Sequence, residues 1–230
     1  ARAKRAPKRG VAANSPVPAV GLQRRERAQN KKIMAIEKYT ETEFTDKNGY
    51  TYTTVANDDN GVRTYTLKNG LKVFLAQNFD APRIQTYIPV RTGSNNDPAD
   101  NTGLAHYLEH MMFKGTSKIG SSDWEKESAL LEEISDLFEQ HKAERDPGKK
   151  KEIYNKIDAV SQEASKFAIA NEYDKCISSL GAIGTNAHTW HDETVYKNNI
   201  PNNELEKWLK IERERFSKLV LRLFHTELES

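Results

Sequence analysis

The chain has 230 residues, which is enough to bury a sizeable core and to form one large domain. Only 37% of the residues are hydrophobic, which indicates that part of the chain is not packed in a core. Residues 1–32 carry ten Lys or Arg and one acid, so that 25 of the 35 basic and 32 of the 33 acidic residues lie in 33–230. The net charge of +2 therefore combines a basic tail with an acidic domain. The single cysteine, Cys176, excludes an intrachain disulfide and a cysteine metal cluster.

Residues 1–61 are predicted to be a basic, disordered tail followed by a linker. Low hydrophobicity and several Pro and Gly residues favour disorder in the tail. Residues 33–61 are polar and are predicted to form a linker that contains at most one short strand. A basic tail can bind nucleic acid or anionic lipid, but a solvated extension is the preferred interpretation and no nucleic-acid partner is expected. No apolar run is long enough to span a membrane. No signal-peptide core is visible, but the chain starts with Ala1 and its start is basic and poor in acids, so an exported bacterial and a mitochondrial location both stay open.

The folded domain is predicted to cover residues 62–230 and to open with strands. Two alternating runs flank Asn69-Gly70, a dipeptide that strongly favours a hairpin turn. Residues 83–90 alternate as a third strand. A helix is expected over 102–116, with Thr102 as its N-cap and Gly115 as its stop.

Residues 123–180 have apolar residues at helical spacing and are predicted to form a helical-hairpin insert, broken at Asp146-Pro147-Gly148 into two antiparallel helices. Strands are expected at 183–189 and 193–198. A further helix is expected from Asn202 to about Leu223, with another segment opening at His225. Strands followed by helices and again by strands favour an α+β domain, with helices packed on one side of a largely antiparallel sheet.

The sequence His106-Tyr-Leu-Glu-His110 is the most informative motif in the chain. Two histidines four residues apart lie on one face of a helix, where both imidazoles can reach one zinc ion at about 2.0–2.1 Å. Glu109 projects from nearly the same face, and a carboxylate there can take a proton from a metal-bound water. Histidines at this spacing also arise by chance as ordinary surface or core residues. The added glutamate, in the order H-x-x-E-H, is typical of an inverted zinc-peptidase motif.

The stretch from Thr102 to Thr116 resembles the M16 family, the insulinase and pitrilysin-like zinc peptidases that include the mitochondrial processing peptidase. Other segments resemble that family in the same order along the chain, over roughly residues 62 to 230. The resemblance also implies the α+β fold predicted above. These segments are Tyr65–Leu75, Val90–Ser94, Gly184–Thr189 and Glu193–Tyr196.

The resemblance implies a glutamate from a later helix as the third zinc ligand. At the usual family spacing this ligand would fall near Asn186, which is not an acid. The helical insert shifts the expected ligand to positions 234 to 237, just beyond Ser230, so the chain is expected to be truncated at the C-terminal end of its domain. Glu227 then matches a supporting acid two helical turns before that ligand. A rearranged site with Glu227 or Glu229 as the ligand stays open.

The resemblance also assigns Asn186 and Ala187 to a strand that pairs with an extended peptide substrate, where backbone hydrogen bonds provide affinity. The alternative is an ordinary edge strand. Four further histidines are expected to be exposed or structural and not to bind metal: His141, His188, His191 and His225.

The motif and the resemblance together predict a Zn²⁺-dependent metalloendopeptidase that hydrolyses peptides or unfolded polypeptides. Glu109 is expected to act as general base on a zinc-bound water and then to protonate the leaving amine. The resemblance implies a second M16-like half or subunit that closes over the substrate, so this chain alone is expected to have weak or no activity. The alternative function is a non-catalytic M16-like subunit or fragment that binds extended peptides or a partner half.

Overall fold

The computed structural model describes residues 40–224 and 227. They fall into two compact units that part after Asn78. The sequence predicted that the folded domain begins at residue 62, and that boundary stays a prediction.

The first unit contains an antiparallel sheet of four strands in the order β1-β2-β3-β4. The hairpin predicted at Asn69-Gly70 is confirmed, because β3 and β4 pair across this turn and Gly70 has φ +86°. The first hairpin, β1–β2, lies within residues 33–61, where the sequence predicted a linker with at most one short strand. The strands are β1 (Glu41–Thr45), β2 (Thr51–Val55), β3 (Arg63–Thr66) and β4 (Lys72–Leu75).

Contacts between aromatic rings on neighbouring strands explain why this polar segment forms a sheet. Tyr52 stacks on Phe44 of β1 at 5.6 Å and lies 5.2 Å from Tyr65 of β3, measured between ring centroids. Such cross-strand pairs stabilise a sheet. Asp46 closes the β1–β2 turn by accepting the backbone N–H groups of Asn48 and Tyr50, each at 2.9 Å.

The second unit is built on a three-stranded antiparallel sheet in the order β5-β7-β6. The strand predicted at 83–90 is confirmed as β5 (Arg83–Val90). The strand predicted at 183–189 is confirmed as β6 (Ile183–Thr189). The third strand, β7 (Thr194–Pro201), extends three residues beyond its predicted end. Because β7 lies in the centre, β6 forms one edge of this sheet.

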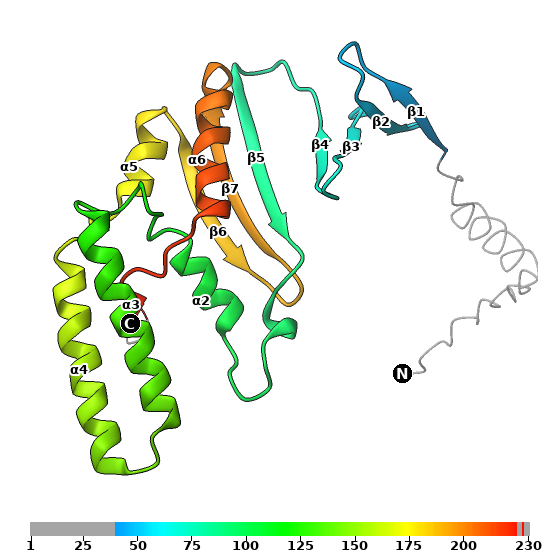
Figure 1. The fold of residues 1–230 in the computed structure, drawn as a ribbon. Coiled ribbons are helices and arrows are strands. Elements are labelled where there is room, and N and C mark those ends of the chain that lie inside the picture. The colour runs from blue at the N-terminus through cyan, green and yellow to red at the C-terminus, as the bar shows by residue number, and fades with distance from the viewer. Residues whose placement is uncertain (1–39, 225–226, 228–230) are drawn as a thin grey trace, which may run out of the picture. The chain divides into compact units, whose positions relative to one another are not determined.

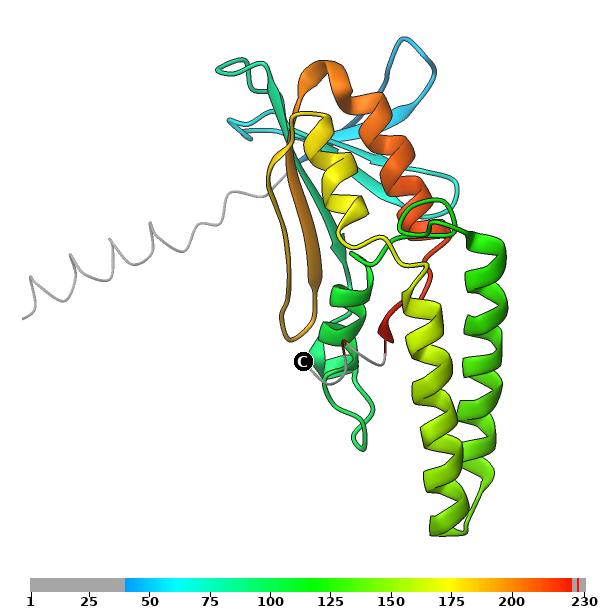
Figure 2. The ribbon, with the colours of Figure 1, turned by 90° about the vertical axis from the view of Figure 1, so that its left-hand side faces the viewer.

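Helices cover one face of this sheet, as the sequence predicted. Figure 2 shows α5 (Glu172–Ser179) and α6 (Leu205–Ser217) on the same side of the strands. Ile84 and Ile88 of β5 pack on that side, whereas the alternate residue Tyr87 is exposed. The domain is therefore α+β. The buried residues of this core are Tyr173, Ile177, Ile200 and Trp208.

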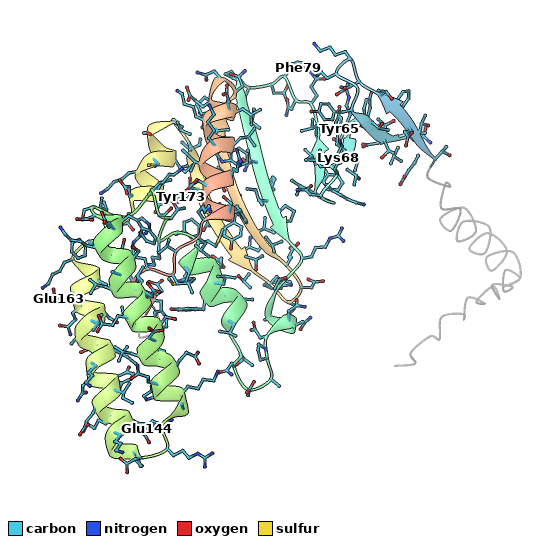
Figure 3. The ribbon with its side chains drawn as sticks, viewed as in Figure 1. Tyr65, Lys68, Phe79, Glu144, Glu163 and Tyr173 are labelled. Atoms are coloured by element: carbon cyan, nitrogen blue, oxygen red, sulfur yellow. The ribbon has the colours of Figure 1, made fainter. Side chains whose placement is uncertain are left out.

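The predicted helical hairpin is also confirmed, with its break at the expected turn. In Figure 1, α3 (Trp124–Ala143) and α4 (Pro147–Ser165) lie side by side, and Glu144, labelled in Figure 3, marks the turn between them. Asp146 accepts the Lys149 backbone N–H and so caps α4. The hairpin has a core of its own, made by Ile134, Leu137, Ile157 and Ala164.

Two boundaries in the second half of the domain differ from the predictions. Residues 123–180 contain a third helix, α5, because the chain turns at Asn171, which has φ +57°. Helix α6 ends at Ser217 and not near Leu223, since Leu219 pairs with Thr116 in an isolated β-bridge. A new helical turn starts at Phe224, and His225, where the sequence predicted a new segment, lies outside the described residues. Across residues 40–224 and 227, no helix is long and apolar enough to cross a membrane.

Candidate active site

Helix α2 (Leu104–Met111) carries the H-x-x-E-H motif and is shorter than predicted. Its N-cap residue is Gly103, with φ +94°, and not Thr102. The capping carboxylate comes from Asp97, which accepts the backbone N–H groups of Gly103 at 2.7 Å and Ala105 at 2.9 Å. A negative charge at this position also complements the helix dipole. The start of α2 is therefore fixed by the preceding loop.

The two histidines of α2 point their Nε2 atoms toward each other. These atoms are 3.1 Å apart, and the ring planes meet at 87°. Two nitrogens bound to one tetrahedral zinc at about 2.0–2.1 Å would be about 3.3 Å apart, so His106 and His110 fit a shared ion. The same distance also suits one N–H···N hydrogen bond between neutral rings. Within the described part of the chain, no third His, Cys, Asp or Glu joins them in a metal-binding cluster.

Glu109 lies beside the histidines and is buried, with 8% of its surface exposed. The Thr189 hydroxyl, at the end of β6, donates to Glu109 Oε2 at 2.8 Å. No hydrogen bond joins Oε1 to any residue in the described part of the chain. One carboxylate oxygen is therefore fixed by the sheet, which leaves the other to accept a proton.

Glu227 reaches the site from the C-terminal segment and contacts His110. Its Oε1 lies 2.9 Å from His110 Nδ1, and its Oε2 lies 2.5 Å from Lys114 Nζ. The hydrogen bond from Lys114, supported by His110 and opposed by partial burial, holds the pKa of the Glu227 carboxyl below its ordinary value. Glu227 thus lies on the Nδ1 side of His110, away from the paired Nε2 atoms.

The sequence analysis predicted the third zinc ligand just beyond Ser230, and no described residue tests that prediction. Ser230 itself lies outside the described residues, as does Glu229, one of the two acids that could serve in a rearranged site. The other acid, Glu227, contacts His110 through Nδ1 and not through Nε2. The position of the third ligand and the supporting role of Glu227 both stay predictions.

Tyr107 attaches the same C-terminal segment to α2. Its hydroxyl donates to the Phe224 carbonyl at 2.6 Å. Burial, with a smaller effect from the charge of Glu227, raises the pKa of Tyr107 to about 12. The hydroxyl therefore remains a hydrogen-bond donor at neutral pH.

The proposed substrate strand residues, Asn186 and Ala187, lie on the edge strand β6. Trp190 donates its backbone N–H to the Glu193 carbonyl at 2.7 Å, which closes the β6–β7 hairpin. Hydrogen-bonded pairs alternate along an antiparallel ladder, so the backbone groups of Ala187 and Thr189 face away from β7. The Asn186 side chain accepts the Ala187 N–H at 2.9 Å, which leaves the Ala187 carbonyl directed at the open edge.

Helical spacing predicted that the two histidines and Glu109 lie on one helix, but it did not predict the roles of Asp97, Thr189 and Lys114, which cap this helix, bind Glu109 and bind Glu227. Asp97 and Thr189 act from other segments, and only their short polar side chains signalled such a role. Lys114 lies one turn beyond His110, a spacing that places both side chains within reach of the same partner, Glu227. The other described histidines lie elsewhere: His141 is beside Tyr154, His188 is 3.9 Å from Glu193, and His191 is 3.4 Å from Ser94.

The chain matches the family model described as Insulinase (Peptidase family M16) over residues 72–143. That segment contains β5, α2 and α3, and therefore the complete H-x-x-E-H motif.

Individual proteins that are similar to this chain are named as insulin-degrading enzymes, zinc proteases or processing peptidases. An insulin-degrading enzyme homolog of Dictyostelium discoideum is 42% identical over 62 residues, which cover 27% of this chain and 6% of that protein. An uncharacterized zinc protease of Bacillus subtilis (strain 168) is 36% identical over 56 residues, 24% of this chain and 14% of that protein. A probable mitochondrial-processing peptidase subunit beta of Arabidopsis thaliana is 39% identical over 75 residues, 33% of this chain and 13% of that protein. The matched segments thus span only a small part of each relative, and they show a similarity to M16 peptidases over the part of the chain that carries the H-x-x-E-H motif.

Proposed function

We propose that this chain carries the metal-binding and general-base residues of a zinc metalloendopeptidase that hydrolyses peptides or unfolded polypeptides. The observation that carries the proposal is the convergence of two imidazole Nε2 atoms, 3.1 Å apart, beside the buried carboxylate of Glu109. The family match and the relative named as a zinc protease support the choice of zinc.

His106 and His110 would hold the ion through Nε2. Zinc, when bound, polarises the scissile carbonyl and lowers the pKa of a water molecule. Glu109 accepts a proton from the attacking water through the oxygen that Thr189 does not bind, and then passes this proton to the leaving amine. The Thr189 hydrogen bond keeps the carboxylate from turning away during both transfers.

Catalytic zinc sites have three protein ligands. We propose that the third is a glutamate, as the family resemblance implies. Glu227 would then not bind the metal itself but would accept the Nδ1–H of His110, which does. Two imidazoles alone are expected to bind zinc more weakly than a complete set of three ligands.

An extended peptide would bind along β6 as an additional strand. Asn186 and Ala187 lie on this edge, and Thr189 at its end contacts the general base. A peptide paired with β6 would therefore pass next to Glu109. We propose that a second M16-like half or subunit covers the peptide from the opposite side, so that residues 1–230 alone have weak or no activity.

A zinc titration of the full 230-residue chain against a competing chelator tests the metal site. We expect one zinc per chain, and His106→Ala or His110→Ala should weaken binding at least about 100-fold, since even residues outside the ligand shell contribute about 10–100-fold. His141→Ala on α3 is the matched control, and its zinc affinity should be unchanged. Equal zinc affinity for His106→Ala and the unaltered chain would contradict the proposal. A chain that binds extended peptides and no zinc would favour the non-catalytic alternative.

A further inference from the structure

Lys114 and His110 engage the two oxygens of one carboxylate. The Lys114 ammonium lies 2.5 Å from Glu227 Oε2, and His110 Nδ1 lies 2.9 Å from Oε1. Lys114 is four residues beyond His110, and helix α2 ends between these two residues, at Met111. A carboxylate held at both oxygens has a fixed plane, so Lys114 determines which way Glu227 presents Oε1 to the ring.

We propose that Lys114 is a positioning residue for the metal site, an inference that rests on the function proposed above. A neutral imidazole carries one N–H, and the acceptor that faces one nitrogen selects the tautomer. Glu227, oriented by Lys114, keeps the proton of His110 on Nδ1 and leaves the Nε2 lone pair directed at His106. In the metal-free chain, His106 is then the donor in the 3.1 Å contact between the two Nε2 atoms.

The segments that carry Lys114 and Glu227 are held together by further hydrogen bonds. Arg222 donates to the Lys114 carbonyl at 2.8 Å and stands five residues before Glu227 in the chain. Tyr107 holds the intervening Phe224 carbonyl at 2.6 Å. The bridge therefore joins two segments that are already fixed, which lowers the entropy cost of forming it.

A second lysine in the same loop shows the contrast with an ordinary surface pair. Lys118 approaches Glu214 only to 3.6 Å and its side chain is 76% exposed, whereas that of Lys114 is 26% exposed. Exposed pairs of the first kind contribute little energy. Lys118 therefore provides a matched control with the same charge and a different role.

The first readout is the His110 tautomer in the metal-free full chain, measured by NMR of the ring nitrogens. We expect the Nδ1–H form to dominate in the unaltered chain and to lose its dominance in Lys114→Met. Lys114→Arg, which keeps the charge, should restore it, and Lys118→Met should match the unaltered chain. Backbone spectra should show that all variants fold alike.

The second readout is zinc affinity in the same chelator competition. Lys114→Met should weaken zinc binding about three- to tenfold, less than the effect of about 10–100-fold for a direct ligand partner, and Lys114→Arg should recover it. Unchanged tautomer and affinity in Lys114→Met, or equal changes in Lys118→Met, would overturn the proposal. A chain that binds no zinc would instead refute the proposed function, while the metal-free tautomer measurement would still test Lys114.

Discussion

Glu109→Gln is expected to reduce peptide hydrolysis about 10²–10⁴-fold, the usual contribution of general acid–base catalysis. Glutamine has nearly the same shape, and its amide oxygen can still accept the Thr189 hydroxyl. It cannot take a proton from the attacking water. Zinc affinity should change little because Glu109 projects beside the two imidazoles and does not bind the ion in the proposed site.

The measurement is kcat/KM for an unstructured fluorogenic peptide, with this chain assembled with the second M16-like half that the proposed function expects. Glu133→Gln, an exposed glutamate on α3, is the matched control and should keep full activity. Cleavage that survives Glu109→Gln would exclude the general-base role. Loss of zinc together with activity would instead make Glu109 a ligand.

Arg222→Met is expected to lower the free energy of unfolding by about 3–5 kcal/mol, the usual cost of removing one member of a buried ion pair. Arg222 is 2% exposed, and its Nη2 lies 2.8 Å from Glu127 Oε2 on α3. It also donates to the carbonyls of Lys114 and Thr116. The variant would leave the fully buried Glu127 carboxylate without its partner.

Urea unfolding of the full chain, followed by circular dichroism, measures this effect. The double variant Arg222→Met with Glu127→Leu should recover much of the loss, because no charge is then left buried. Lys210→Met removes a pair with Glu206 that is exposed at both ends, and it should leave the free energy of unfolding nearly unchanged. If Arg222→Met lowers the free energy of unfolding by less than about 1 kcal/mol, and not by the expected value of about 3–5 kcal/mol, this ion pair does not hold the helical hairpin to the domain.

The parts of the fold that sequence reasoning predicted well are set by local residues. The turn at Asn69-Gly70 and the alternation over 83–90 fixed β3, β4 and β5, and Asp146-Pro147-Gly148 fixed the break between α3 and α4. In each case the signal lies within the element or at its end.

The boundaries that sequence reasoning missed depend on distant segments. Helix α6 ends early because Leu219 pairs with Thr116, about a hundred residues away in the sequence. Tertiary contacts of this kind routinely override local helix propensity. The cap of α2 comes from Asp97, outside the helix. The β1–β2 hairpin is joined to the sheet by the contact between the tilted rings of Tyr52 and Tyr65, which only the pairing with β3 brings together.

The candidate site also combines features that local spacing predicts with features that depend on distant segments. Helical spacing was sufficient to place His106, Glu109 and His110 together, and the structure brings Glu227 to His110. The Thr189 hydroxyl reaches Glu109 across 80 residues of sequence, through the packing of β6 on α2. No spacing rule in a single sequence carries that information.

Crystals of the chain grown with zinc would test the metal site most directly, by anomalous scattering at the zinc absorption edge. We expect one strong peak about 2.0–2.1 Å from the Nε2 atoms of both His106 and His110. A zinc-loaded crystal with no peak between these two rings, or with the rings turned apart, would contradict the proposed metal site and the hydrolytic function built on it.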